Sequence, residues 1–554
     1  MDNYRLVVGI VFAVSLFLLY DAWIRDRAPV PNVAPQTQAP AAAPGPSTAV
    51  PAPIPSAVPK PAATPGSEQA AAPTMAPGHT ISVKTDFLAA EIDTTGGQIT
   101  RLELLQHQER ADSSRPYVLF QKSPDHVYFS QSGLTGNNLP NHTTPFTAEK
   151  ASYVLQQGEQ NMVVTLRAQT DAAQVVKTYT FTRGSYVVDV SFTVTNRTQS
   201  AFEPYAYFQL VRDEKAPSES SKMVPTYSGV EVYTEANKLT KVGFTDISQG
   251  KATYPKSAKD GWIAIVQHYF LAAWLPPPGT QREFFMRPVG NNLVAAGVIL
   301  PVGQIAAGAA ATTSARLYAG PQEQDRLKVL APGLELAVDY GWLRVLAVPL
   351  FWVLKQIHAW VGNWGVAIIV LTILIKAAFY PLSAASYRSM ARMKVLAPKL
   401  QRLKERYGDD RQKMHQAMIE LYKTEKINPL GGCLPIVVQI PVFIALYWVL
   451  LLSVELRQAP FFWWIKDLSA PDPLFILPVL MGATMFIQSW LNPTPPDPMQ
   501  ARLMKIMPIA FSVFFFFFPA GLVLYWLVNN VLSITQQWYI TRGLERSKPA
   551  HGEA

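Results

Sequence analysis

The chain has almost no cysteine and few charged residues for its length. One cysteine, Cys433, stands among 554 residues, which excludes an internal disulfide framework. Charged residues make up only 16% of the chain, and several long stretches contain hardly any. The sequence also lacks a GxxxxGK[ST] phosphate loop, an HExxH metal pair and a GxSxG nucleophile elbow. We therefore expect a protein that is not an enzyme, with no catalytic residue, no metal ligand and no cofactor.

Long apolar stretches lie at both ends of the chain, and a region of ordinary polar content separates them. The first stretch, Leu6–Ile24, is followed by the charged Arg25-Asp26-Arg27 rather than by a small-x-small cleavage site. This flank favours an uncleaved transmembrane anchor over residues 1–27 and disfavours a cleaved signal peptide. Residues 28–78 are mostly Ala and Pro, a composition that cannot bury a core and predicts a disordered linker.

Residues 79–325 are predicted to form an all-β domain, because their pattern has a period of two. Val175, Lys177, Tyr179 and Phe181 alternate with polar residues, a turn follows, and Val188–Val194 returns with the same alternation, which is typical of a hairpin. About 240 residues is a size that a β-sandwich reaches. Residues 326–363 are predicted as a linker and an amphipathic helix, Gly341–Gly362, that lies in a membrane interface.

Five apolar stretches within residues 364–541 predict a helical membrane core. They are 364–382, 434–452, 474–490, 503–518 and 521–540. The loop 383–428 holds eleven Lys or Arg against five Asp or Glu, a net charge of +6, so the positive-inside rule places it in the cytoplasm. Counting spans from this loop places the β domain outside and both ends of the chain, including the tail 542–554, inside. The predicted fold is multi-domain: an α-helical polytopic core with an anchor helix, and an all-β outer domain.

The basic loop 383–428 is itself predicted to be an antiparallel helical hairpin. Apolar residues repeat at three and four on both arms, with Gly408-Asp409-Asp410 as the turn. Two interpretations of its methionines stay open: they form a soft surface for varied apolar segments, or they hold the two arms together. The hairpin residues that we single out are Met390, Met393, Asp409, Met414 and Met418.

A lysine, Lys376, lies inside the span 364–382, where a charge costs roughly 2.5–3.5 kcal/mol on insertion scales. Other polar residues fall in the same cytoplasmic half of the membrane, whereas the outer half is nearly all apolar. Two interpretations stay open. In the first, a water-filled cavity open only to the cytoplasm solvates the ammonium. In the second, the Lys376 side chain extends to the cytoplasmic surface, and the other polar side chains form hydrogen bonds between helices. The candidate groove residues are Lys376, Gln439, Thr372, Ser512 and Gln536.

Several segments resemble the YidC/Oxa/Alb family of membrane protein insertases. The segments are Asn428–Pro435 (NPLGGCLP), Gln439–Phe443 (QIPVF), Ser453–Phe461 (SVELRQAPF), Asp497–Gln500 (DPMQ), Phe518–Tyr525 (FPAGLVLY) and Tyr318–Pro321 (YAGP). The resemblance covers nearly the whole chain, and the anchor with a large outer domain is similar to the Gram-negative type.

The resemblance implies an activity, a location and partners. Such an insertase places nascent proteins in the bacterial inner membrane and helps them fold, alone or with the Sec translocon, through a hydrophilic groove open to cytoplasm and lipid. Its outer domain would be a periplasmic β-supersandwich. The implied partners are nascent membrane proteins, the Sec translocon (SecYEG and SecDF), the ribosome and the phospholipid bilayer, with no small-molecule substrate.

The resemblance also implies roles for single residues. Lys376 stands in the place of a groove arginine and Gln439 in that of a groove glutamine, although lysine and arginine are not equivalent. Thr372 matches a position that touches the passing substrate helix. The other implied substrate contacts are Ile440, Phe443, Tyr525 and Trp526, the last of which stands where the family more often has tyrosine.

Two other classes of protein compete with this interpretation. A secondary transporter would need a site that opens to both faces, usually built from repeated halves, and the chain shows no internal repeat. A membrane-anchored enzyme with a sugar-binding β domain would need convergent carboxylates or histidines in residues 79–317, and no such set stands out. Deleting the β domain separates them, because an insertase should keep its activity and a sugar enzyme should lose it.

Overall fold

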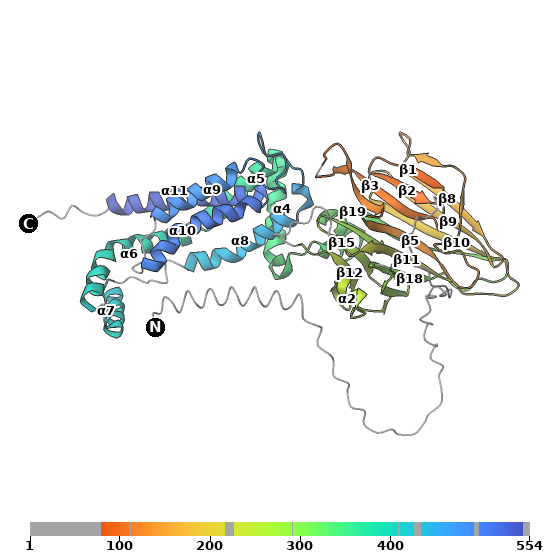
Figure 1. The fold of residues 1–554 in the computed structure, drawn as a ribbon, viewed down its shortest axis with the longest axis horizontal. Helices are drawn as coiled ribbons and strands as arrows, with labels where there is room; N and C mark the ends of the chain where they lie inside the picture. Colours follow the sequence, from red (N-terminus) through yellow and green to blue (C-terminus); the bar gives the residue numbers. More distant parts are fainter. Residues whose placement is uncertain are drawn as a thin grey trace, which may run out of the picture. The chain divides into compact units, whose positions relative to one another are not determined.

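A computed structural model describes residues 79–110, 112–215, 226–290, 292–407, 410–425, 434–491 and 498–546. The predicted anchor 1–27, the predicted linker 28–78 and the hairpin residue Asp409 lie outside the described residues. The described residues belong to one compact unit, which contains a β domain followed by a helical domain (Figure 1).

The β domain consists of two sheets packed face to face, which confirms the predicted sandwich. The ten-stranded sheet has the order β14-β17-β18-β11-β5-β4-β3-β2-β1-β7, and the nine-stranded sheet has the order β13-β12-β15-β16-β19-β10-β9-β8-β6. The first sheet contains β1 (Thr80–Lys84), β2 (Leu88–Asp93), β3 (Gln98–Gln108), β4 (Pro116–Lys122), β5 (Val127–Thr135), β7 (Ser152–Val154), β11 (Tyr205–Asp213), β14 (Ser257–Ala258), β17 (Arg282–Pro288) and β18 (Leu293–Pro301). The second contains β6 (Thr147–Ala148), β8 (Asn161–Gln169), β9 (Ala173–Thr182), β10 (Val187–Asn196), β12 (Gly229–Thr234), β13 (Lys238–Val242), β15 (Trp262–Gln267), β16 (Phe270–Leu275) and β19 (Ala310–Pro321).

The hairpin expected from the period of two is β9–β10. The strands are antiparallel, with Val188 opposite Phe181 and Val194 opposite Val175. Alternate residues of both strands are buried between the sheets, so the apolar side of the pattern is the core side. The last strand, β19, continues to Pro321, a few residues beyond the end of the alternating region.

The alternation also places a lysine, Lys177, on the core side of β9, and the structure buries it completely. Its Nζ donates to the carbonyl oxygens of Gly96 at 2.9 Å, Gly97 at 2.7 Å and Ser132 at 3.2 Å. Gly96 and Gly97 both have positive φ, a conformation that glycine adopts without strain, and this turn directs their carbonyls at the ammonium. Burial lowers the pKa of Lys177 well below its ordinary value.

The helical domain follows the β domain after a short connection. The connection holds α3 (Gln324–Leu330), η1 (Leu334–Ala337) and η2 (Gly341–Leu343), and the β domain itself carries α2 (Phe244–Ser248). The domain contains α4 (Arg344–Val361), α5 (Trp364–Ala378), α6 (Tyr380–Tyr407), α7 (Arg411–Thr424), α8 (Leu434–Leu452), η4 (Val454–Leu456), α9 (Ile476–Leu491), α10 (Pro498–Phe514), η5 (Phe515–Phe517) and α11 (Ala520–Arg546). Helix α11 packs against α5, α6 and α9 (Figure 1).

The predicted first core span, 364–382, is divided in the structure. Helix α5 ends at Ala378, and α6 begins at Tyr380 after a bend of 67°. Pro381 lies in the first turn of α6, where its missing N–H and fixed φ are tolerated, whereas inside a continuous helix it would remove a hydrogen bond. The bend therefore lies just before the proline.

The described residues contain no single helix that is both long and apolar enough to cross a membrane by length and hydropathy. The bent pair α5 and α6 passes that test together, and shorter apolar helices lie at Val438–Leu452, Ile476–Leu491 and Ile506–Phe517. Helix α8 has the bounds expected for the second span. Whether each of the five stretches crosses the membrane stays a prediction.

A set of polar contacts joins the β domain to the loop between α8 and α9. Arg110, after β3, donates to Ser469 Oγ at 2.7 Å and lies 3.6 Å from Asp467 Oδ2. Arg457 donates to the carbonyl oxygen of Gln108 at 2.6 Å, and its guanidinium lies over the rings of two aromatic residues of the β domain. The β domain and this loop therefore belong to the same side of the predicted membrane core.

Candidate functional site

Lys376 lies in the last turn of α5 and is enclosed by protein, with 4% of its surface exposed. Its Nζ donates to Ser533 Oγ of α11 at 2.7 Å. Within the described part of the chain, no carboxylate lies within ion-pair distance of this ammonium. The lysine is thus bound by a neutral hydroxyl, and none of the acids in the described ranges pairs with it.

Thr372 and Gln439, the two predicted neighbours of Lys376, each make their hydrogen bond to another residue. Thr372 is buried one turn earlier on α5, and its hydroxyl donates to the carbonyl oxygen of Ile368 at 2.6 Å. Gln439 of α8 is half-buried, and its Nε2 lies 3.5 Å from Asn529 Oδ1 of α11. Asn529 is one turn before Ser533, so α11 connects Gln439 with the lysine.

Ser512 and Gln536 do not join this group. The hydroxyl of Ser512 donates to the carbonyl oxygen of Pro478 at 3.0 Å, which places Ser512 in the contact between α10 and α9. Gln536 is half-buried on α11, whereas its neighbour Gln537 is buried.

The polar face of α11 toward Lys376 consists of residues that sequence reasoning did not choose. Asn530, Ser533 and Gln537 are all buried, and Asn530 Nδ2 lies 3.4 Å from Thr484 Oγ1 of α9. Their spacing of three and four residues puts them on one side of a helix. That spacing was visible in the sequence, although it does not separate Gln537 from Gln536, which is three residues after Ser533.

Three of the four predicted substrate-contact residues form an aromatic cluster between α8 and α11. Phe443 stacks on Tyr525 with ring centroids 5.7 Å apart and meets Trp526 edge-on at 4.5 Å. Tyr525 is only 2% exposed, whereas Ile440 is 38% exposed. Ile440 is therefore accessible, Phe443 and Trp526 are half-buried, and Tyr525 is enclosed by protein.

The predicted hairpin is present as α6 and α7. Lys399 Nζ of α6 lies 2.6 Å from Glu425 Oε1, the C-cap residue of α7, which fixes an antiparallel arrangement. Asp410 caps α7 by accepting from the backbone N–H groups of Gln412 and Lys413. The methionines Met390, Met393, Met414 and Met418 are half-buried, so each retains surface for a partner while contributing to the hairpin.

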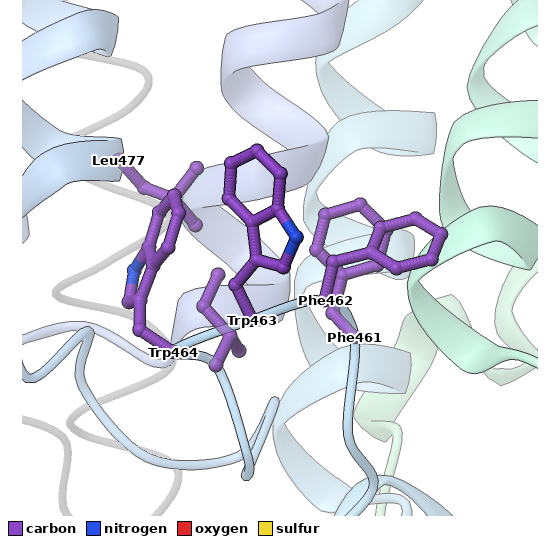
Figure 2. Close-up of a pocket in the computed structure, with 6 residues that line it drawn as sticks. Phe461, Phe462, Trp463, Trp464 and Leu477 are labelled. Atoms are coloured by element: carbon purple, nitrogen blue, oxygen red, sulfur yellow. The ribbon is translucent and has the colours of Figure 1, made fainter.

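A separate apolar pocket lies in the loop between α8 and α9. Figure 2 shows its aromatic side chains, Phe461, Phe462, Trp463 and Trp464, with Leu477 of α9. The cavity has a volume of about 290 Å³, and Trp463 is 89% exposed. Exposed tryptophan and phenylalanine are typical of a membrane–water interface, so this pocket is more consistent with anchoring in lipid than with chemistry.

Comparisons with known proteins agree with this architecture. The family described as "YidC periplasmic domain" matches residues 80–353, and the family described as "60Kd inner membrane protein" matches residues 356–548. A membrane protein insertase YidC of Nitrosospira multiformis is 55% identical over 558 residues, covering 99% of this chain and 98% of the relative. One of Aromatoleum aromaticum is 54% identical and covers 99% of both chains.

A solved structure titled as an active YidC insertase with its first transmembrane domain resolved is also similar. It is 18% identical, covers 84% of this chain and 93% of its own, and has a TM-score of 0.40.

Proposed function

The chain belongs to the YidC family of membrane protein insertases, and we propose which of its residues receive the nascent protein. It is an inner-membrane insertase with a periplasmic β domain, and its substrates are nascent membrane proteins. The relatives are named as insertases rather than as enzymes, in keeping with a process in which this chain makes and breaks no covalent bond.

We propose that both chain ends and the α6–α7 hairpin are cytoplasmic. The net charge of +6 on residues 383–428 supports this orientation. The contacts of Arg110 and Arg457 support it independently, since they tie the α8–α9 loop to the periplasmic domain. The hairpin, which precedes α8, then lies on the opposite side of the membrane from that loop.

The groove of this insertase is proposed to centre on Lys376. The observation that carries the proposal is a buried ammonium bound by a serine hydroxyl and by no carboxylate among the described residues. Such a charge attracts an anion strongly, because water screens it poorly. An acidic tail flanking a hydrophobic substrate helix would be drawn to Lys376, which shortens the path of the tail through hydrocarbon.

The substrate helix itself is proposed to pass along α8 and α11. Ile440, Phe443 and Trp526 supply an apolar surface there, and entry into lipid releases roughly 25 cal/mol per Å² of apolar area removed from water. This release of free energy drives insertion without a nucleotide. The half-buried methionines of the hairpin are proposed to receive the chain earlier, when it leaves the ribosome or is shared with the Sec translocon.

The test is insertion of two substrates that differ only in whether their translocated tail is acidic or neutral. We expect Lys376→Ala and Lys376→Glu to slow the acidic-tailed substrate, with the larger effect for Glu, and to leave the neutral-tailed substrate near its normal rate. Lys376→Arg is the matched control, because it keeps the charge. Normal insertion of the acidic tail by both Ala and Glu variants would refute the capture of the tail by this charge.

A further inference from the structure

Ser533 lies where three helices meet in the membrane core. Its hydroxyl accepts a hydrogen bond from Lys376 Nζ of α5 at 2.7 Å and donates to the carbonyl oxygen of Asn529 of its own helix, α11, at 2.7 Å. The side chain of Tyr387 of α6 also lies beside Ser533. Lys376 and Ser533 are both buried, and Tyr387 is half-buried.

These contacts fix the direction of the serine hydroxyl. A hydroxyl has one proton to donate and two lone pairs that accept. The proton goes to the carbonyl oxygen of Asn529, and a lone pair accepts from Lys376 Nζ. Rotation of the hydroxyl would lose at least one of these bonds, so the position of Ser533 is strongly determined.

A lysine needs such a partner more than an arginine does. The ammonium is a compact charge on a flexible stem, whereas a guanidinium is a rigid planar fork. Serine fixes the ammonium without neutralising it, since it carries no charge of its own. An aspartate or glutamate in its place would bind Lys376 more strongly and would compete with the acidic tail of a substrate.

We propose that Ser533 is the positioning residue for Lys376: it holds the ammonium at a defined depth and leaves its charge available to an acidic substrate tail. This rests on the proposed function, in which Lys376 attracts that tail. The alternative is that Ser533 is only a polar contact between helices, in which case its loss affects every substrate alike.

The experiment measures insertion of the acidic-tailed and neutral-tailed substrates by the full-length protein in phospholipid vesicles. One hydrogen bond to the ammonium predicts a loss of about three- to tenfold for the acidic tail in Ser533→Ala, with the neutral tail unchanged. Ser533→Thr keeps a hydroxyl and should restore insertion. Thr535→Ala is the matched control, because Thr535 makes the same bond to the carbonyl four residues earlier but is exposed.

An equal loss for both tails in Ser533→Ala, or no loss for either, overturns the proposal. If Ser533→Ala does not fold, Ser533→Cys gives the same test, since a thiol has nearly the same shape but is a weaker acceptor for the ammonium. It should slow the acidic tail by less than Ser533→Ala and spare the neutral tail, and an equal loss for both tails contradicts the proposal. Lys376→Ala is run beside them: if it slows the acidic tail while Ser533→Ala does not, only the positioning role fails.

Discussion

The buried lysine of the β domain gives a prediction whose magnitude depends on pH. Lys177→Met keeps the length of the side chain but removes the donor of three hydrogen bonds to backbone carbonyls. Each such bond contributes about 0.5–1.5 kcal/mol net, and an amine that has lost a proton donates only two of them, so above the folded pKa their loss destabilises the domain by about 1–3 kcal/mol. The substitution also removes the cost of burying an amine that prefers to be charged, which opposes this loss.

The sign of the pH dependence follows from the lowered pKa of Lys177. Burial lowers this pKa well below 10.5, so between the folded pKa and 10.5 the unfolded chain binds more protons than the folded domain. The contribution of Lys177 to stability therefore rises with pH in that window, by up to about 1.4 kcal/mol per pH unit. The methionine variant lacks this slope, and the destabilisation by Lys177→Met should be larger at pH 9 than at pH 7, by up to about 2.7 kcal/mol.

The assay is pulse proteolysis in urea on the full-length protein in detergent, with the free energy of unfolding of the β domain measured at both pH values. Lys84→Met, at an exposed position of β1, is the matched control and should change little at either pH. A destabilisation by Lys177→Met that is the same at pH 7 and pH 9 would show that the buried lysine stays charged in the folded domain. That result would refute the reasoning.

Three further predictions concern the junction between the domains, the α6–α7 hairpin and an acid in η4. Arg110→Ala should weaken the contact between the domains by about 1–3 kcal/mol, since it removes a charge-assisted hydrogen bond. A double-mutant cycle of Arg110→Ala with Ser469→Ala, measured by thermal unfolding, should show that the two sites are coupled. Asp410→Ala should destabilise α7 by about 1 kcal/mol through loss of its N-cap, seen as faster amide hydrogen exchange in the first turn, whereas Asp410→Asn keeps the cap and should not. Burial raises the pKa of Glu455 from 4.5 to about 7. Between these pH values the folded protein binds more protons than the unfolded chain, so stability should fall as pH rises from 4.5 to 7. Glu455→Gln should remove this pH dependence of thermal unfolding, and an unchanged pH dependence would contradict the assignment.

Much of the fold could be predicted because two patterns dominate the chain: a period of two in the β domain and long apolar stretches in the helical domain. The period of two gave the β9–β10 hairpin and the sandwich, since alternate side chains of a strand face one core. The apolar stretches predicted the helices of the core. The break between α5 and α6 was missed because residues 364–382 look continuous in hydropathy, although Pro381 marked where a helix must restart.

The candidate site was only partly predictable. The sequence indicates how deep in the membrane a residue lies, but it is less informative about which neighbouring helix that residue faces. Lys376 and Gln439 were chosen by depth, and α11 does bring them near each other. Ser512 was chosen by the same criterion but faces α9. Ser533 was not chosen, because a serine in an apolar helix costs little and gives a weak signal until its partner across the interface is known.

The most direct test of the account is photo-crosslinking to a nascent membrane protein stalled on the ribosome. A photoreactive residue is placed at Ile440 or Phe443 on the proposed route, and at Val479 of α9, which is exposed and apolar but off that route. The account predicts crosslinks from positions 440 and 443 to the hydrophobic helix of the substrate and few from position 479. Equal crosslinking from all three positions, or crosslinking from position 479 alone, would contradict the route along α8 and α11.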